Sequence, residues 1–153
     1  MAWKPVDRRA IAAWRWSFAL GGAFALAACA AFMLASRLPQ AATVPALLLL
    51  SCVAAALGWW YPAAKYRRLD YSVDETGIVI RAGVFWRTQS SLARTRIQHT
   101  DIAQGPLQRH YGIATLKLYT AGSHYTKIEL PGLAHDVAVA LRLDLQREDG
   151  DAV

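Results

Sequence analysis

The residues best suited to binding chemistry lie in one polar segment in the second half of the chain. Arginines alternate there with amides and a histidine, and the candidate docking residues are Arg94, Arg96, Gln98, His99, Gln104, Gln108 and Arg109. An arginine guanidinium presents its N–H donors as a planar fork, which suits phosphate and carboxylate groups. The segment therefore predicts a surface that binds a lipid headgroup or a partner protein.

A second interpretation of this segment is structural. Gly105 and Pro106 interrupt its extended pattern, and Gly112 ends a short helical turn that follows. Amide and arginine side chains at such a bend satisfy backbone groups instead of a ligand. The residues to which we assign structural roles are Gln98, Gly105, Pro106, Gly112 and, in a later turn, Gly122. The three arginines of the segment fit both interpretations equally.

The sequence carries no local pattern for catalysis, cofactor binding or metal binding. It has no Gly-rich phosphate loop, no nucleophile elbow and no paired-carboxylate signature. Metal-ligating histidines often recur at His-x-x-x-His spacing, and the histidines at positions 99, 110, 124 and 135 do not. Cys29 and Cys52 lie in apolar stretches, away from the histidines. We therefore expect no enzymatic activity, no cofactor and no bound metal.

Two charge-free stretches near the start of the chain indicate that this segment works at a membrane. Trp16–Ser36 is 21 residues long and Leu38–Ala64 is 27 residues long, with Arg37 between them. At 1.5 Å per residue, 21 helical residues reach about 31 Å, which is enough to cross a bilayer core. We expect a helical hairpin with spans at about 16–36 and 42–62. Neither span has an Asp, Glu, Lys, Arg or His near its middle, which favours an anchor over a transporter.

Basic and aromatic residues flank the predicted hairpin on the same side. The basic residues are Lys4, Arg8, Arg9 and Arg15 before the first span and Lys65, Arg67 and Arg68 after the second. The aromatic residues are Trp14, Trp16, Trp59, Trp60 and Tyr61. Basic flanks stay on the cytoplasmic side, and Trp and Tyr rings favour the headgroup level. We therefore expect both termini in the cytoplasm of a bacterial cell, at its cytoplasmic (inner) membrane.

After the hairpin the apolar period changes from helical to two residues, which predicts strands. The alternating segments are 69–74, 78–82, 114–119 and 125–130. Gly83 starts a further segment at Val84–Thr88, and Arg94–Gln104 is expected to be one more strand with a bulge or bend. Pro131-Gly132 is expected to end the strands. Leu133, Val137, Leu141 and Leu145 then form the apolar stripe of a closing helix. The predicted order is six or seven short antiparallel strands and one amphipathic helix.

Several long motifs in this region resemble one bacterial family. They are Ile97-Gln98-His99, Gln104-Gly105-Pro106-Leu107, Tyr111-Gly112-Ile113, Leu130-Pro131-Gly132-Leu133 and the earlier Gly83-Val84-Phe85-Trp86-Arg87. With the two-span N-terminal region, they are similar to the pleckstrin-homology-like (PH-like) domain of YdbS-type bacterial membrane proteins. The resemblance implies an antiparallel barrel or sandwich of about seven strands closed by a C-terminal helix. It implies no catalytic residue.

These features predict three parts of the chain. Residues 1–64 form a basic segment and the membrane hairpin, residues 65–148 form a cytoplasmic PH-like domain, and residues 149–153 form an acidic tail. Between positions 65 and 143 there are eleven basic and six acidic side chains. Because the two signs are interleaved, this domain is a poor candidate for a dedicated anionic-lipid cradle.

We expect a non-enzymatic role, as a membrane-anchored interaction or scaffolding module. The expected partners are membrane lipids and another membrane protein of related PH-like type, with a homo-oligomer as a further arrangement and no nucleic acid. Two alternatives remain open: a sensor of anionic lipid headgroups, and an accessory subunit of a membrane enzyme or transporter.

Overall fold

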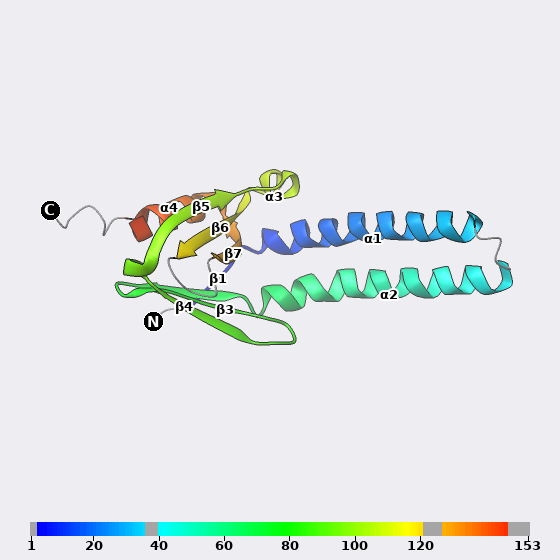
Figure 1. The fold of residues 1–153 in the computed structure, drawn as a ribbon, viewed down its shortest axis with the longest axis horizontal. Coiled ribbons are helices and arrows are strands. Elements are labelled where there is room, and N and C mark those ends of the chain that lie inside the picture. The colour runs from blue at the N-terminus through cyan, green and yellow to red at the C-terminus, as the bar shows by residue number, and fades with distance from the viewer. Residues whose placement is uncertain (1–2, 36–39, 121–126, 147–153) are drawn as a thin grey trace.

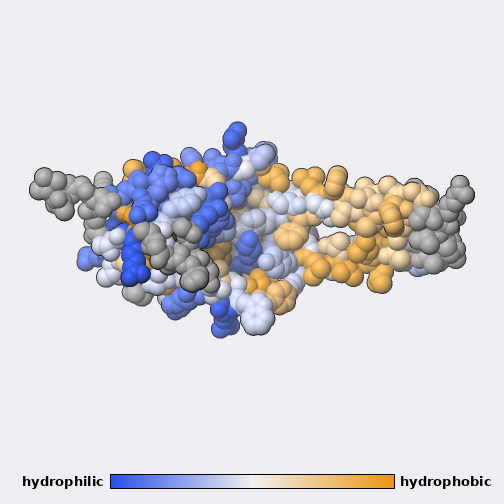
Figure 2. All heavy atoms as spheres, viewed as in Figure 1, coloured by the Kyte–Doolittle hydropathy of each residue, from blue (hydrophilic) through white to orange (hydrophobic). Residues whose placement is uncertain are grey.

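In the computed structural model, two long helices lie side by side, run in opposite directions and extend from one end of a β-domain (Figure 1). The structure describes residues 3–35, 40–120 and 127–146. The helices are α1 (Arg9–Ala35) and α2 (Gln40–Tyr66). Both are long and apolar enough to cross a membrane, and their apolar windows are not buried inside the protein. Figure 2 shows the same division, with apolar residues along the helices and polar residues over the β-domain. The helical hairpin predicted from the sequence is therefore present.

The β-domain consists of two antiparallel sheets that do not close into a barrel. The first has four strands in the order β1 (Lys4–Pro5), β2 (Asp70–Asp74), β3 (Gly77–Ala82) and β4 (Thr88–Ala93). The second has three strands in the order β5 (Ile97–Ala103), β6 (Ile113–Thr120) and β7 (Lys127–Ala134). Two helices complete the domain, α3 (Pro106–His110) and α4 (His135–Gln146). Of the seven strands in the described residues, six follow the hairpin, as the predicted six or seven did, whereas β1 precedes it, where no strand was predicted.

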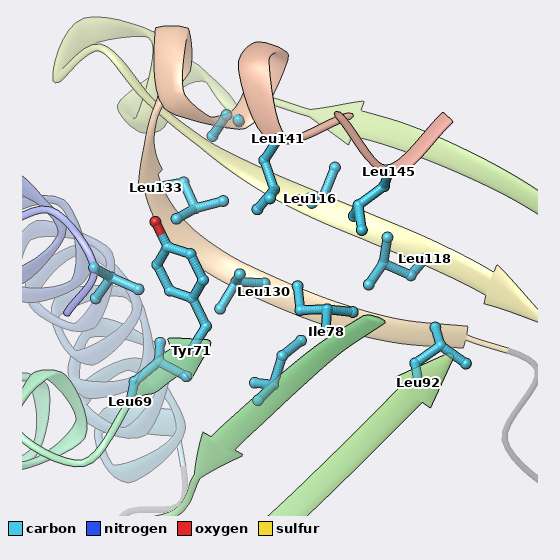
Figure 3. Close-up of a cluster of buried hydrophobic side chains, with 14 residues drawn as sticks. Leu69, Tyr71, Ile78, Leu92, Leu116, Leu118, Leu130, Leu133, Leu141 and Leu145 are labelled. Atoms are coloured by element: carbon cyan, nitrogen blue, oxygen red, sulfur yellow. The ribbon is translucent and has the colours of Figure 1, made fainter. Parts of the chain in front are cut away.

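Leucine and isoleucine side chains from both sheets and from α4 form one core (Figure 3). Leu116 and Leu118 on β6 are completely buried, as is Leu130 on β7. They are two residues apart on β6 because alternate side chains of a strand point to the same face. Tyr71 enters this core from β2 with its hydroxyl directed toward Leu133, and burial raises the pKa of its phenol. Apolar burial of this kind is the main driving force for folding.

The closing helix is present, and Leu133, Leu141 and Leu145 of the predicted apolar stripe are buried, but Val137 is not. Ala138, Leu141 and Leu145 are buried, whereas Val137 is 39% exposed. The prediction that Val137 is buried is therefore wrong. Leu133 belongs to β7, so the helix begins only at His135, and in its first turns Ala138 faces the core in place of Val137.

Pro131-Gly132 does not end the last strand, contrary to the prediction. Strand β7 continues to Ala134, with a register shift because Gly132 is an extra residue between the pairs Pro131–Thr115 and Leu133–Ala114. Gly132 has a φ of +84°, a conformation that L-residues with a side chain rarely adopt. Proline is tolerated because β7 is an outer strand of its sheet, where one side of the backbone has no ladder partner.

The polar segment also begins differently from the prediction. Arg94–Arg96 is a single 3₁₀ turn, and the strand starts only at Ile97. The expected bulge is present in β5, between Ile97 and His99. The turn at 121–124, with Gly122, and the acidic tail at 149–153 lie outside the described residues.

The first turns of α1 are packed into the β-domain instead of standing clear of it. This helix begins at Arg9, seven residues before the predicted span, and Ala10 and Ala13 are buried against Ile113. The backbone N–H of Asp7 donates to the Gly132 carbonyl at 2.8 Å. A Cβ on Gly132 would lie 2.9 Å from the Ala10 Cβ, so only glycine allows this approach. We call this packed region the α1 junction.

Candidate docking surface

Arg94 is held inside the domain by its own contacts. Its side chain is only 12% exposed and forms an ion pair with Asp144 of α4 at 2.8 Å. It also donates to the Asp144 carbonyl at 2.8 Å and to the Asp74 carbonyl at 3.2 Å. Arg94 thereby joins the β2–β3 turn to the closing helix, and most of its donors are engaged without a ligand.

The amides of the segment bond to the loop around α3. Gln104 donates to the Ile113 carbonyl at 2.8 Å, and Gln108 donates to the Thr115 hydroxyl at 3.0 Å. Gln108 also accepts the backbone N–H of Gly105 at 3.0 Å, which caps the start of α3. Gly112 then leaves the helix with a φ of +66°, as expected of a residue after a helix end. These glutamines shape the loop and are only partly exposed.

The remaining candidates are exposed but lie apart from one another. His99 pairs with Asp101 at 2.9 Å on the outer face of β5, where its ring also lies 5.9 Å from that of Tyr119. Gln98 is exposed at the bulge. Arg96 precedes β5, whereas Arg109 lies on α3 after its other end (Figure 1). The candidate residues are thus distributed along the whole strand and do not converge on one point.

Positions 96, 98 and 100 do not share a strand face, although alternate residues of one regular strand would. Arg96 belongs to the 3₁₀ turn, and the bulge after Ile97 removes Gln98 from the regular register. Thr100 points inward and is 3% exposed, and its hydroxyl has no hydrogen-bond partner among the described residues. The regular two-residue alternation of β5 therefore begins only after the bulge.

A hollow between the two sheets offers a better-defined surface. It has a volume of about 550 Å³ and lies where β4 and β7, the outer strands of the two sheets, approach without pairing. We call it the corner groove, and its lining residues are Ile80, Ala82, Thr88, Gln89, Ser90, Ser91, Leu92, Arg96, Thr120, Lys127, Ile128 and Glu129. Of the residues proposed from the sequence, only Arg96 contributes. The groove exists because β4 and β7 do not pair with each other, and no local sequence motif predicts it.

Charges in the corner groove largely cancel. Lys127 and Glu129 form an ion pair at 2.5 Å. Their hydrogen bond raises the pKa of the Lys127 amine and lowers the pKa of the Glu129 carboxyl, so both groups are charged at neutral pH. Arg96 forms no ion pair among the described residues. The groove therefore presents one unpaired guanidinium among hydroxyl, amide and aliphatic groups.

The described residues contain no group of three or more His, Cys, Asp or Glu side chains able to hold a metal ion. Most polar side chains that the sequence singled out bond to neighbours within the domain. The geometry therefore offers binding surfaces, and nothing in the described residues suggests catalysis.

Comparison with known proteins places this architecture in a family. The profile of the bacterial PH domain matches residues 17–149, which is most of the chain. The chain belongs to the bacterial PH domain family. The UPF0699 transmembrane protein YdbS of Bacillus subtilis (strain 168) is 34% identical over 86 residues. These residues are 56% of this chain and 52% of that relative, so the match spans about half the length of YdbS. No solved structure matches.

The family match confirms two expectations from the sequence. The chain is a YdbS-like transmembrane protein with a bacterial PH domain, and its two sheets with a C-terminal helix are consistent with the PH-like fold. The sheets remain open at the corner groove, so a sandwich describes this domain better than a closed barrel.

Proposed function

We propose that this bacterial PH domain protein is a non-enzymatic, membrane-anchored interaction module that docks an extended segment of a partner protein in the corner groove. The observation that carries the proposal is the pair of long strand edges that border this groove. β4 has six residues and β7 has eight, and among the described residues no strand pairs with the outer edge of either.

Unpaired strand edges are suited to peptide binding. They present rows of backbone N–H and C=O groups that readily pair with another extended chain. Aliphatic side chains, among them Ile80, Leu92 and Ile128, also line the groove and offer apolar contacts to alternate residues of such a peptide. By contrast, β1 is only two residues long, and α4 packs against β5.

The distribution of charge favours a protein over a lipid headgroup as the ligand. An anionic headgroup would be best held by several converging cations. Arg94 is engaged with Asp144, Lys127 is neutralised by Glu129, and Arg109 lies at the far end of β5. Arg96 alone remains for a phosphate in the groove, which is a weak basis for headgroup selectivity.

The anchor limits where the partner can be found. Because α1 and α2 hold the domain at the membrane, the partner is another membrane protein, of related PH-like type, or a second copy of this chain. In a second copy, the same two edges are available, and a two-fold axis would bring identical edges together in antiparallel pairing. Basic residues at both domain-side ends of the hairpin support a cytoplasmic location for the domain.

A site-specific photo-crosslinking experiment in native membranes tests this function. The photoreactive residue replaces Ser91, which is exposed on β4 in the groove, and Arg142, which is exposed on α4, serves as the matched control. We expect a defined membrane-protein adduct from position 91 and none from position 142. Adducts of lipid alone at position 91, or the same protein adduct at both positions, would overturn the proposal.

A further inference from the structure

Two large aromatic side chains stand exposed on the turn between β3 and β4. Phe85 is 74% exposed and Trp86 is 87% exposed. We call the turn Gly83–Arg87 the aromatic tip. Adjacent exposed aromatics of this size are unusual on a surface that faces only water, and they mark contact with another apolar phase. Phe85 and Trp86 do not contribute to the hydrophobic core, because neither side chain belongs to the buried cluster.

The position of the aromatic tip identifies that phase. The ring of Phe85 lies 6.2 Å from the ring of Trp60, which belongs to the transmembrane helix α2. Trp60 is four residues, or about 6 Å along the helix axis, inside Ala64, the last residue of the charge-free stretch. Trp rings concentrate at this headgroup level. In Figure 1 the turn of the β3–β4 hairpin extends alongside the domain end of α2.

The tip is shaped as a fixed turn and is not a loose loop. Gly83 has a φ of +124°, and a Cβ there would lie 1.6 Å from the carbonyl oxygen of Trp86. Arg68, which follows α2, donates a hydrogen bond to the Val84 carbonyl, and the Val84 side chain is buried. The backbone is therefore held against the end of α2, with the next two side chains directed outward.

Basic residues surround the aromatic tip. Arg87 ends the tip, and Arg67 and Arg68 are exposed where α2 meets the domain. A cluster of aromatic rings with flanking cations is typical of segments that lie in the interface of a membrane with anionic lipids. The same combination flanks the two spans, so the tip continues the interfacial belt of the hairpin.

We propose that the aromatic tip inserts into the headgroup region of the bilayer beside α2 and forms a third membrane attachment of the domain. Its ligand is the lipid surface itself, through apolar contact of Phe85 and Trp86 and attraction of Arg87 to anionic headgroups. This attachment fixes the orientation of the domain relative to the membrane. It is independent of what binds in the corner groove, because the two aromatic side chains are not part of that groove's lining.

Fluorescence quenching in vesicles tests this insertion with the full-length chain. In a background with Cys29→Ala and Cys52→Ala, Trp86→Cys receives an environment-sensitive fluorophore. The matched control is Glu75→Cys in the β2–β3 turn, which is also exposed but lies at the opposite end of β3. Both proteins are reconstituted into vesicles of phosphatidylethanolamine and phosphatidylglycerol, with or without a nitroxide on the upper acyl chain.

We expect a blue-shifted emission from position 86, strong quenching by the nitroxide lipid and weak quenching by aqueous iodide. Position 75 should show the reverse. Equal iodide quenching at both positions would overturn the proposal. Protection of position 86 from both quenchers would also overturn it, because the tip would then be packed against protein.

Discussion

The β-domain contacts its two membrane helices in different ways. At the α1 junction, Ala10 and Ala13 are buried against the domain and Gly132 removes a side chain so that the helix can approach. At the end of α2, a short turn leads into β2, and the neighbouring rings of Trp60 and Phe85 stay exposed. The start of α1 is therefore buried in the domain. The end of α2 also reaches the domain, because Pro62 is buried and Tyr66 packs against the core, but its Trp60 side chain stays exposed next to Phe85.

This difference shows that the anchor is more than a tether. A helix that runs unbroken from a protein core into a membrane fixes the direction of the domain relative to the span. Val6, which precedes α1, is 3% exposed in the same core as Leu116, so the N-terminal segment contributes to folding. Three predictions test the contrast between the two junctions, from the largest expected effect to the smallest, and a fourth concerns a turn remote from both.

Removal of residues 1–64 should have the largest effect. The fragment Lys65–Val153 loses Val6, the first turns of α1, strand β1 and the bond from Asp7 to Gly132. Burial of one valine and a few hydrogen bonds together contribute about 4 kcal/mol, out of a typical total of about 5–15 kcal/mol. We expect the fragment to lack a sharp cooperative transition in thermal or urea unfolding.

The control for this truncation restores the packed segment without the membrane spans. Residues 3–14 are joined to residue 65 by a short Gly/Ser linker, which is feasible because the Lys65 amine lies 4.4 Å from the Trp14 ring centre. Cooperative unfolding should return. If the fragment alone unfolds as sharply as this linked chain, the α1 junction is not part of the core.

Gly132→Val should have the next largest effect. The new side chain would require a strained φ of +84° and would collide with Ala10 and with the ring of Trp14. Strain and overpacking together should cost about 3 kcal/mol. The measurement is the midpoint of thermal unfolding in detergent. Gly105→Ala is the matched control, because a Cβ there meets nothing within 4 Å, and a similar loss in both variants would argue against close packing at this junction.

Arg68→Ala tests the α2 side and should cost less. It removes the hydrogen bond to the Val84 carbonyl, and a partly exposed bond of this kind contributes about 1 kcal/mol. We expect a small decrease in the unfolding midpoint together with faster proteolysis at the β3–β4 turn. Arg67→Ala removes an equal charge from the neighbouring exposed position and should leave both unchanged. Identical behaviour of the two variants would show that this bond does not hold the turn.

The smallest effect is expected at a turn remote from both junctions. The hydroxyl of Thr76 donates to the Asp74 carboxylate at 2.5 Å, and this bond lowers the pKa of Asp74 below its ordinary value of 3.8. Since the folded pKa is the lower one, the contribution to stability is complete above pH 3.8 and disappears as the pH falls through the folded pKa. Thr76→Val should raise this pKa and slightly reduce the acid sensitivity of unfolding. A wild-type acid profile in the variant would contradict the assignment.

Local patterns in the sequence were sufficient for much of the architecture. Charge-free length identified the two helices of the hairpin, and the two-residue period identified the strands around Leu116 and Leu130. Residue type also indicated the bulge in β5 and the structural glycines, because a helix end such as that at Gly112 favours a residue without a side chain. These features depend on neighbours in the chain, which is why they can be read from it.

The tertiary structure decided what depends on distant contacts. Arg94 bonds to Asp144, fifty residues away, so its guanidinium is not free to bind a ligand at the candidate surface. The tertiary structure brought β1 and α1 into a domain that begins after the hairpin, and it left β4 and β7 apart to form the corner groove. Pairing partners, edges and close approaches arise only when remote segments meet, and the chemistry of each residue alone does not specify them.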